Sequence, residues 1–238
     1  MNRMETYMTM KTLCSNFLGV ALLALSPIAG ATTPPQSVAG FFTQVVLDVR
    51  HKAVEKDWAP AKRGGALGFG DIVRTGASSF AIIKFTDKSI VKVRESSELT
   101  LTSETALSKN VELQKGVIGF NVQKQQKNSE FRFTSPTSVA SIRGTGGRFA
   151  TRELSDTLIV VEGNVLLTNS LSNQSVEVGA GFTGISNADG TIQVRPSTSG
   201  ERALGQAAAT PGDEQNQLEL EMRDSQGNKK KLKIQYKE

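Results

Sequence analysis

Hydrophobic and polar residues alternate with a period of two over a long middle section of the chain, from Gly40 to Val194. The alternation comes in short segments bounded by turn-forming residues and filled with β-branched and aromatic residues, as half-buried strands require. No window of a dozen residues in this section carries a capped apolar stripe at helical spacing. Clear examples of the segments are residues 45–49, 81–85, 89–93, 99–102, 131–134 and 158–161. The pattern therefore predicts an all-β domain over residues 40–194.

Three glycines recur at the mouths of predicted strands. Gly70, Gly116 and Gly163 lie 46 and 47 residues apart, and each opens a strand-like segment. Because glycine lacks a Cβ, it permits a positive φ or a close approach of two backbones at such points. The spacing fits a twisted, solenoid-like stack of short strands or, alternatively, a β-sandwich with regular hairpins. The sequence leaves both architectures open.

The composition changes after Val194. Residues 195–215 hold several prolines and glycines and few large apolar residues, which predicts a linker, with a short helix over residues 203–209 as the lesser alternative. Residues 216–238 predict a C-terminal β-hairpin, and because a lone hairpin is marginal in water we expect it to dock on the main domain or a partner. The register that gathers the apolar groups on one face pairs Met222 with Leu232, Leu220 with Ile234 and Leu218 with Tyr236, and sets Glu221 opposite Lys233.

The N-terminus carries one apolar run, residues 17–25, followed by a proline and small residues. Spanning a bilayer takes about 20 apolar residues, whereas roughly 7 to 15 behind a cation suit an export signal. Lys11 supplies the cation, and Ala29 and Ala31 occupy the small-x-small positions that a signal peptidase accepts. We therefore expect residues 1–31 to be a signal peptide cleaved after Ala31, with an uncleaved anchor as the alternative.

Removal of this segment would leave a mature chain that is periplasmic or secreted and has no transmembrane span. It would also remove the single cysteine, Cys14, which precedes the apolar run and so is not placed as a lipid acceptor. The acidic Glu5 and the stretch before Lys11 are unlike the usual basic start of a signal peptide, which makes Met8 or Met10 an alternative start.

The amino-acid composition mainly excludes classes of function. The 238 residues include 28 Lys and Arg, 23 Asp and Glu, and a single histidine. One histidine cannot build a His-rich metal site, and the setting of His51 between Arg50 and Lys52 predicts an exposed side chain without a catalytic role. The small basic excess is scattered, and export argues against a nucleic-acid partner. We expect neither a cofactor nor a bound metal.

Two glycine pairs begin like nucleotide-binding motifs and then depart from them. Gly65 and Gly70 have the spacing of a phosphate-binding loop, but Asp71 stands where its lysine belongs. The run 144–146 begins like a dinucleotide fingerprint, but Phe149 stands where the third glycine belongs, and no helix pattern follows. Both are predicted to be turns. Nothing in the sequence brings two acidic residues together as an acid/base pair, so an enzyme is the poorest hypothesis.

Several stretches taken together resemble the FecR-type domain. They are residues 68–76 with 81–89, residues 131–136 through 142–145, and residues 160–165. The family pattern has a Gly-Asp strand start, a strand pair joined by an Asp-x-Ser turn, a segment ending in Thr-Pro, a Gly-Thr turn leading to a phenylalanine, and a return strand with glycine. That phenylalanine stands two positions later here. The residues that carry the resemblance are Gly70, Asp71, Gly116, Pro136, Gly144, Thr145, Phe149 and Gly163.

The resemblance, which covers roughly residues 40–190, implies a non-catalytic, all-β envelope domain. Family members with the full architecture carry a cytoplasmic anti-sigma segment, one membrane helix and this domain in the periplasm, where it senses an outer-membrane transporter. The residues before Phe17 are too few for a folded anti-sigma segment. We therefore expect a stand-alone exported FecR-like protein that binds an envelope protein or ligand in sensing or signalling.

Two other hypotheses remain. One is a structural module that binds the cell wall or its polysaccharides through Trp58, Phe41 and Phe42. The other is a hydrolase, which would need a cleft that holds a base of perturbed pKa. The partner under the first two hypotheses is an envelope protein or a cell-wall glycan.

Overall fold

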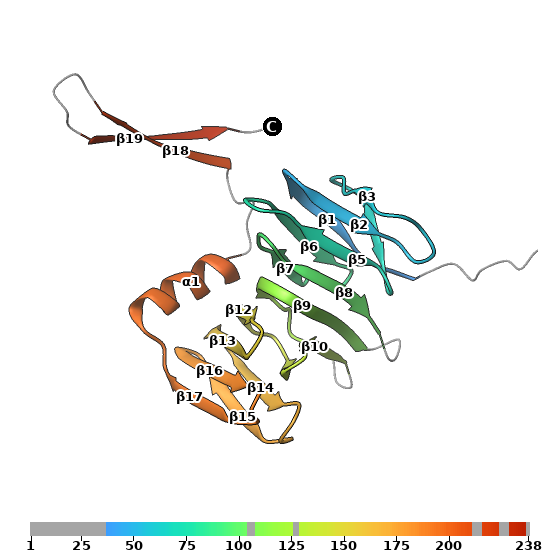
Figure 1. Cartoon of the computed structure of the whole chain (residues 1–238), viewed down its shortest axis with the longest axis vertical. Coiled ribbons are helices and arrows are strands. Elements are labelled where there is room, and N and C mark those ends of the chain that lie inside the picture. The colour runs from blue at the N-terminus through green and yellow to red at the C-terminus, as the bar shows by residue number, and fades with distance from the viewer. Residues whose placement is uncertain (1–36, 104–107, 126–128, 211–215, 224–228, 237–238) are drawn as a thin grey trace, which may run out of the picture. The chain divides into compact units, whose positions relative to one another are not determined.

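The computed structural model describes residues 37–103, 108–125 and 129–210, and the backbone of residues 216–223 and 229–236. Over this part of the chain it contains nineteen strands and one helix (Figure 1). The all-β prediction is confirmed. The predicted signal peptide, with its cleavage residues Ala29 and Ala31, lies outside the described residues. Among the residues that are described, none belongs to a helix with the length and hydropathy needed to cross a membrane.

The first seventeen strands form one hydrogen-bonded network with two halves, called here sheet A and sheet B. In spatial order, sheet A contains β4 (Ala66–Gly68), β1 (Val38–Val46), β6 (Phe80–Phe85), β7 (Ile90–Val93), the second part of β9 (Ser108–Asn121), β12 (Gly146–Thr151), β13 (Ser155–Glu162), β16 (Phe182–Asn187) and β17 (Ile192–Pro196). Sheet B contains β3 (Ala59–Pro60), β2 (Val49–Lys52), β5 (Ile72–Thr75), β8 (Glu98–Thr102), the first part of β9, β10 (Glu130–Thr134), β11 (Ser138–Ile142), β14 (Asn164–Asn169) and β15 (Ser175–Gly179).

Strand β9 belongs to both sheets, and Gly116 lies where it passes from one to the other. The residues before Gly116 pair with β8 and β10 of sheet B, whereas residues 116–121 pair with β12 of sheet A. Gly116 has a φ of +101°, and a Cβ there would lie 2.2 Å from Oγ of Ser97. Only glycine fits such a bend. The two glycines that recur at the same spacing, Gly70 and Gly163, also have a positive φ.

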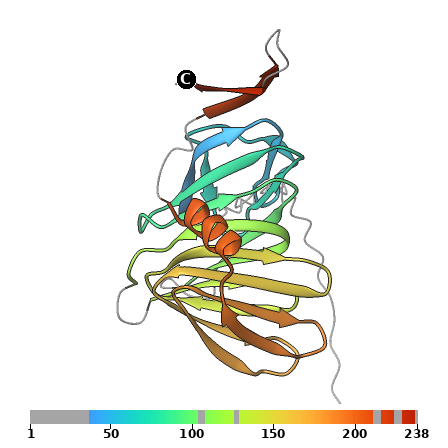
Figure 2. The same cartoon turned by 90° about the vertical axis from the view of Figure 1, so that its left-hand side faces the viewer.

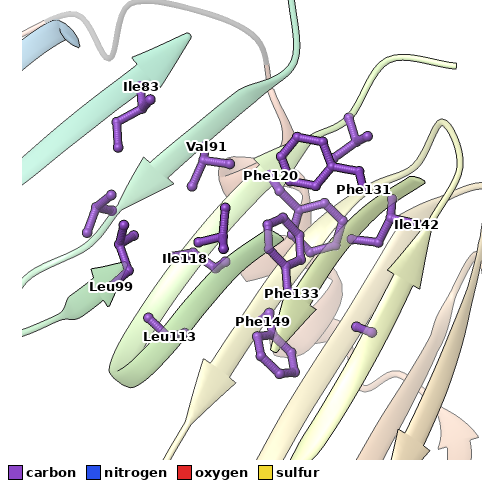
Figure 3. Close-up of a cluster of buried hydrophobic side chains, with 14 of the residues drawn as sticks. Ile83, Val91, Leu99, Leu113, Ile118, Phe120, Phe131, Phe133, Ile142 and Phe149 are labelled. Atoms are coloured by element: carbon purple, nitrogen blue, oxygen red, sulfur yellow. The ribbon is translucent and has the colours of Figure 1, made fainter. Parts of the chain in front are cut away.

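The core lies between sheet A and sheet B and takes alternate residues from both. Phe120 and Phe149 enter it from sheet A, and Phe131 and Phe133 from sheet B; all four are fully buried (Figure 3). The ring centroids of Phe120 and Phe133 are 4.8 Å apart, so the two sheets interlock through these rings. Each such pair adds about 0.5–1.5 kcal/mol beyond the burial of its area.

Consecutive hairpins alternate between the two sheets as the chain advances. The hairpins β10–β11 and β14–β15 lie in sheet B, whereas β12–β13 and β16–β17 lie in sheet A. The chain therefore winds around one core that lies between sheet A and sheet B. The structure thus has a feature of each architecture that the sequence left open: successive hairpins follow one another along the core, as in a stack, and two sheets face each other, as in a sandwich.

Residues 195–210 form no linker, contrary to prediction, because α1 (Ser199–Ala209) occupies most of this stretch. Its N-terminus has a capping box: the Glu201 N–H donates to the Thr198 hydroxyl, and the Thr198 N–H donates to the Glu201 carboxylate. The helix lies across the outer face of sheet A (Figure 2). A Cβ at Gly205 would lie 2.7 Å from Val161, so the glycine that suggested a linker instead lets the helix approach the sheet.

The C-terminal end of α1 is tied to sheet A by side chains from two strands. Nδ2 of Asn121 donates to the carbonyl oxygen of Ala209 at 3.1 Å, and Nζ of Lys92 lies 3.5 Å from the carbonyl oxygen of Ala207. Carbonyl groups in the last turn of a helix lack intrahelical partners, so these donors satisfy them. Gly119 on β9 leaves room for Ala208, which a Cβ would meet at 2.7 Å.

The predicted C-terminal hairpin forms, but its register differs from the predicted one. Strands β18 (Asn216–Arg223) and β19 (Lys229–Tyr236) pair Leu220 with Leu232 and Leu218 with Ile234, two residues away from the prediction. A shift of two residues preserves the face of every side chain, so the apolar pattern alone could not choose between the registers. The acidic residue opposite Lys233 is accordingly Glu219. Docking of this hairpin stays a prediction.

Candidate functional site

The aspartate of the Gly-Asp motif is buried and anchors the loop before β5. The Asp71 carboxylate accepts hydrogen bonds from the N–H groups of Gly68 (2.9 Å) and Val54 (3.3 Å), and its Oδ2 lies 2.8 Å from Nε2 of His51. The His51 side chain is 19% exposed, so the prediction of an exposed histidine is wrong. The pairing of β2 with β5 brings His51 close to Asp71, the residue just before β5. The charged sequence neighbours of His51 give no sign of this contact.

The turn that holds the motif proline covers a buried carboxyl. Pro136 is exposed between β10 and β11, and the hydroxyls of Ser135 and Ser138 donate to Oδ2 of Asp156. Oδ1 of Asp156 and the Thr151 hydroxyl, its neighbour across the β12–β13 hairpin, make no hydrogen bond among the described residues. Burial raises the pKa of Asp156, and the two serine hydroxyls and the nearby Thr151 offset part of the rise.

A carboxyl of raised pKa is what the hydrolase hypothesis required, but this one is closed to solvent. Asp156 has 0% exposure, and a general base must come within hydrogen-bond reach of a substrate proton. No group of three His, Cys, Asp or Glu side chains that could hold a metal occurs in the described part of the chain. The Asp156 cluster is therefore part of the fold rather than a reaction centre.

The Gly-Thr motif and the later motif glycine form two turns that touch through their backbones. Gly144 and Gly163 have φ values of +79° and +76°, and a Cβ on Gly163 would lie 2.7 Å from the carbonyl oxygen of Gly144. The Thr145 hydroxyl donates to the carbonyl oxygen of Asn164 at 3.0 Å. Thr145 also exchanges two backbone hydrogen bonds with Val122. The motif residues thus fasten the end of β9 to the turns before β12 and β14. The motif residue Phe149, which follows in β12, belongs to the core.

A polar cavity of about 370 Å³ opens beside these turns. Three ionisable side chains surround it: Lys124 after β9, Arg143 after β11, and Glu162 at the end of β13. All three are exposed, and none makes a hydrogen bond or ion pair within the described residues. Its lining residues are Asn121, Val122, Gln123, Lys124, Arg143, Gly144, Thr145 and Glu162. This cavity is the candidate functional site.

The charged residues of the cavity were missed at the level of sequence, although each lies close to a motif residue or strand end. Arg143 immediately precedes Gly144, and Glu162 immediately precedes Gly163. A motif glycine next to a charged residue was therefore the available signal. This signal does not point to Lys124, the third charged residue of the cavity, because only the pairing of β9 with β12 brings Lys124 close to the other two.

The three aromatic residues proposed to contact polysaccharide do not form one surface. Phe42 is 1% exposed and belongs to the core, so its proposed role is wrong. Phe41, its neighbour on β1, points the other way and is 45% exposed. Trp58 is partly buried, with the Arg74 guanidinium 4.5 Å from its ring centroid. Phe41 is thus the exposed aromatic residue of the three.

The fold and the motif turns define an all-β domain with two sheets around one core, and part of this domain matches the model of a protein family. The model of the FecR protein family matches residues 71–166, so the chain contains a FecR-type domain. The matched segment runs from the buried Asp71 into β14 and includes both motif turns and most of the core. A search of the curated proteins found no match.

Two solved structures share the fold, both crystal structures of a "putative anti-sigma factor" from Parabacteroides distasonis ATCC 8503. The structure at 2.50 Å resolution has a TM-score of 0.50 and 14% sequence identity, and the match covers 62% of this chain and 66% of that chain. The structure at 1.65 Å has a TM-score of 0.50 and 13% identity, and the match covers 66% and 70%. This chain therefore spans just under two thirds of the first structure's length. At such identities the likeness is one of fold.

Proposed function

We propose that this protein is an exported, non-catalytic FecR-type domain that takes part in envelope sensing or signalling by binding a protein or a ligand. The FecR match supports a regulatory role, and so does the fold shared with proteins described as anti-sigma factors. The apolar run at residues 17–25 supports export, with Thr32 as the first residue after cleavage.

We place the binding site at the polar cavity. The observation that carries this assignment is the set of three charged side chains around it, none of which makes a hydrogen bond or ion pair within the described residues. Charged side chains on a protein surface gain little from one another across water, but they bind strongly to a complementary group that displaces water. Lys124 and Arg143 would pair with an anionic group of the partner, and Glu162 would accept from a donor.

The test compares the exported chain with a double variant, Lys124→Gln with Arg143→Gln, in quantitative capture from envelope extract. The matched control is Lys62→Gln with Arg63→Gln, which removes the same charge from an exposed loop far from the cavity in sequence. A partner captured by the wild type and the control but lost by the cavity variant supports the assignment. Equal capture by all three, or no partner for any, contradicts it.

Export is tested separately by fractionation and by the mass of the exported chain. A periplasmic or secreted product that begins at Thr32 supports the proposal. A full-length product that stays in the cytosol contradicts it, whatever the cavity binds.

The exposure of Phe41 supports a second candidate, a structural module that binds the cell wall. Retention on purified sacculi that is lost in Phe41→Ala, but kept in the cavity variant, would favour this candidate over the first. Absence of retention would eliminate it.

A further inference from the structure

Three arginines gather on the outer side of sheet A, at the opposite end of β12 from the polar cavity. Strands β7 and β12 both pair antiparallel to β9, one on each side, so they run parallel and end at the same edge. Arg94 directly follows β7, and Arg152 directly follows β12. The Arg94 N–H donates to Val117, one residue past the bend at Gly116. The two arginines therefore flank the point where β9 leaves sheet B.

Arg148 lies between them and the centre of the sheet. It precedes Phe149, whose ring enters the core, so Arg148 lies on the outer face of β12, where it pairs with Gly119 and Ile159. Its side chain is half-buried, and it makes no hydrogen bond or ion pair within the described structure. Burial lowers the pKa of Arg148, and the charges of Arg152 and Arg94 lower it further.

Four arginines elsewhere in the described chain have carboxylate partners at short range. The contacts are Arg50 with Asp48 (2.9 Å), Arg74 with Glu98 (2.9 Å), Arg132 with Glu130 (2.7 Å) and Arg195 with Glu201 (2.7 Å). The acidic residues next to the arginine cluster in sequence are Glu95 and Glu153, and Glu95 accepts from the N–H of Ser78. Neither acts on the charge of Arg148. Arg148 is thus a half-buried charge that no carboxylate of the described chain offsets.

We propose that Arg94, Arg148 and Arg152 form a binding site for a phosphate group. A guanidinium donates two parallel hydrogen bonds to an oxyanion, and a half-buried one does so with less competition from water. A carboxylate has two oxygens and one charge, whereas a phosphate monoester has three terminal oxygens and up to two charges. The phosphate therefore matches several neighbouring guanidinium groups better.

The test measures pyrophosphate binding to the exported chain by isothermal titration calorimetry at low ionic strength. We expect Arg148→Gln and Arg152→Gln each to weaken binding about tenfold or more. Arg152 is exposed, so its variant remains informative if Arg148→Gln fails to fold. The charge control is Arg50→Gln with Arg63→Gln, which removes two positive charges elsewhere and should leave binding within about twofold. The proposal is overturned if the wild type does not bind pyrophosphate, or if both arginine variants bind it as tightly as the wild type. It is also overturned if the control loses as much affinity as the arginine variants.

A second measurement separates the two sources of such a group. Vesicles of phosphatidylglycerol and of phosphatidylcholine are sedimented with the wild type and with Arg152→Gln. Sedimentation with phosphatidylglycerol that depends on Arg152 assigns the phosphate to a lipid headgroup. Pyrophosphate binding without sedimentation assigns it to a soluble phosphate compound. Sedimentation that is independent of Arg152, together with no pyrophosphate binding, overturns the site.

Discussion

Nε2 of His51 lies 2.8 Å from Oδ2 of Asp71, so the single histidine of the chain contacts the aspartate of the Gly-Asp motif. Asp71 is 2% exposed and also accepts from the backbone N–H groups of Gly68 and Val54. Two segments, residues 51–54 and 68–71, therefore meet at one carboxylate. This arrangement explains the motif aspartate by the structure of the domain, without a ligand.

Replacing Asp71 with Ala should lower the free energy of unfolding by about 2–4 kcal/mol, because it leaves buried donors without an acceptor. Asp71→Asn retains one acceptor oxygen and should lose less. Urea denaturation at neutral pH measures both. The control is Asp48→Ala, which removes an exposed ion pair with Arg50 and should cost no more than about 1 kcal/mol. Equal losses in Asp71→Ala and Asp48→Ala would contradict the structural role.

Replacing Gly116 with Ala should lower the free energy of unfolding by about 3 kcal/mol or more, since the left-handed backbone and the contact with Ser97 both oppose a Cβ. Gly200→Ala is the matched control: a Cβ there would meet no atom within 4 Å, and alanine favours the helix by up to about 1 kcal/mol. Thermal unfolding of the two variants should therefore shift in opposite directions. A Gly116→Ala variant as stable as the wild type would show that β9 passes between the sheets without this bend.

The alternating pattern was sufficient to predict strands because each strand has one face in the core. Phe131 and Phe133 are buried, and Arg132 between them is only partly so, as a period of two requires. The glycine spacing likewise marked residues with positive φ. These properties are local, so a single sequence can reveal them.

The remaining features depend on contacts between distant segments. Asp156 is covered by serines that lie 18 and 21 residues earlier, and Lys124 lines the same cavity as Arg143 only through strand pairing. The helix was only the lesser alternative to a linker, and its predicted start at residue 203 was four residues too late, because Gly200 and Gly205 weaken a helix in isolation, whereas Gly205 improves its contact with sheet A. Hairpin register was missed by two residues because both registers keep the same faces.

Replacing Gly205 with Val should release α1 from sheet A, because a Cβ there would already lie 2.7 Å from Val161 and 3.0 Å from Ile159. Hydrogen exchange should show lost protection over residues 199–209, while the core strands keep theirs. The control is Leu204→Ala, at a side chain that is 54% exposed, where protection should stay unchanged. Full protection of the helix in Gly205→Val would contradict its close packing on the sheet.

The buried carboxyl of Asp156 should make the protein more stable as the pH falls. Burial raises its pKa above the unfolded value of about 3.9, so the folded state binds the proton more tightly. The stabilisation from this group is complete below the unfolded pKa and is lost as the pH rises through the folded pKa. Asp156→Asn keeps an acceptor for Ser135 and Ser138 and provides a donor for Thr151. The stability of this variant relative to the wild type should therefore increase with rising pH.

Asp87 provides a control of opposite sign. Burial by itself raises its pKa, but hydrogen bonds from the Ser89 N–H, Gln125 and Lys109 outweigh it and lower the pKa overall. Its stabilisation is present above about pH 3.9 and is lost as the pH falls through the folded pKa. Asp87→Asn should thus cost most at neutral pH and less in acid. Urea unfolding of the wild type and both variants over a pH series measures the stability of each variant relative to the wild type. If this relative stability changes with pH in the same direction for Asp156→Asn and Asp87→Asn, Asp156 does not carry a buried, destabilised charge.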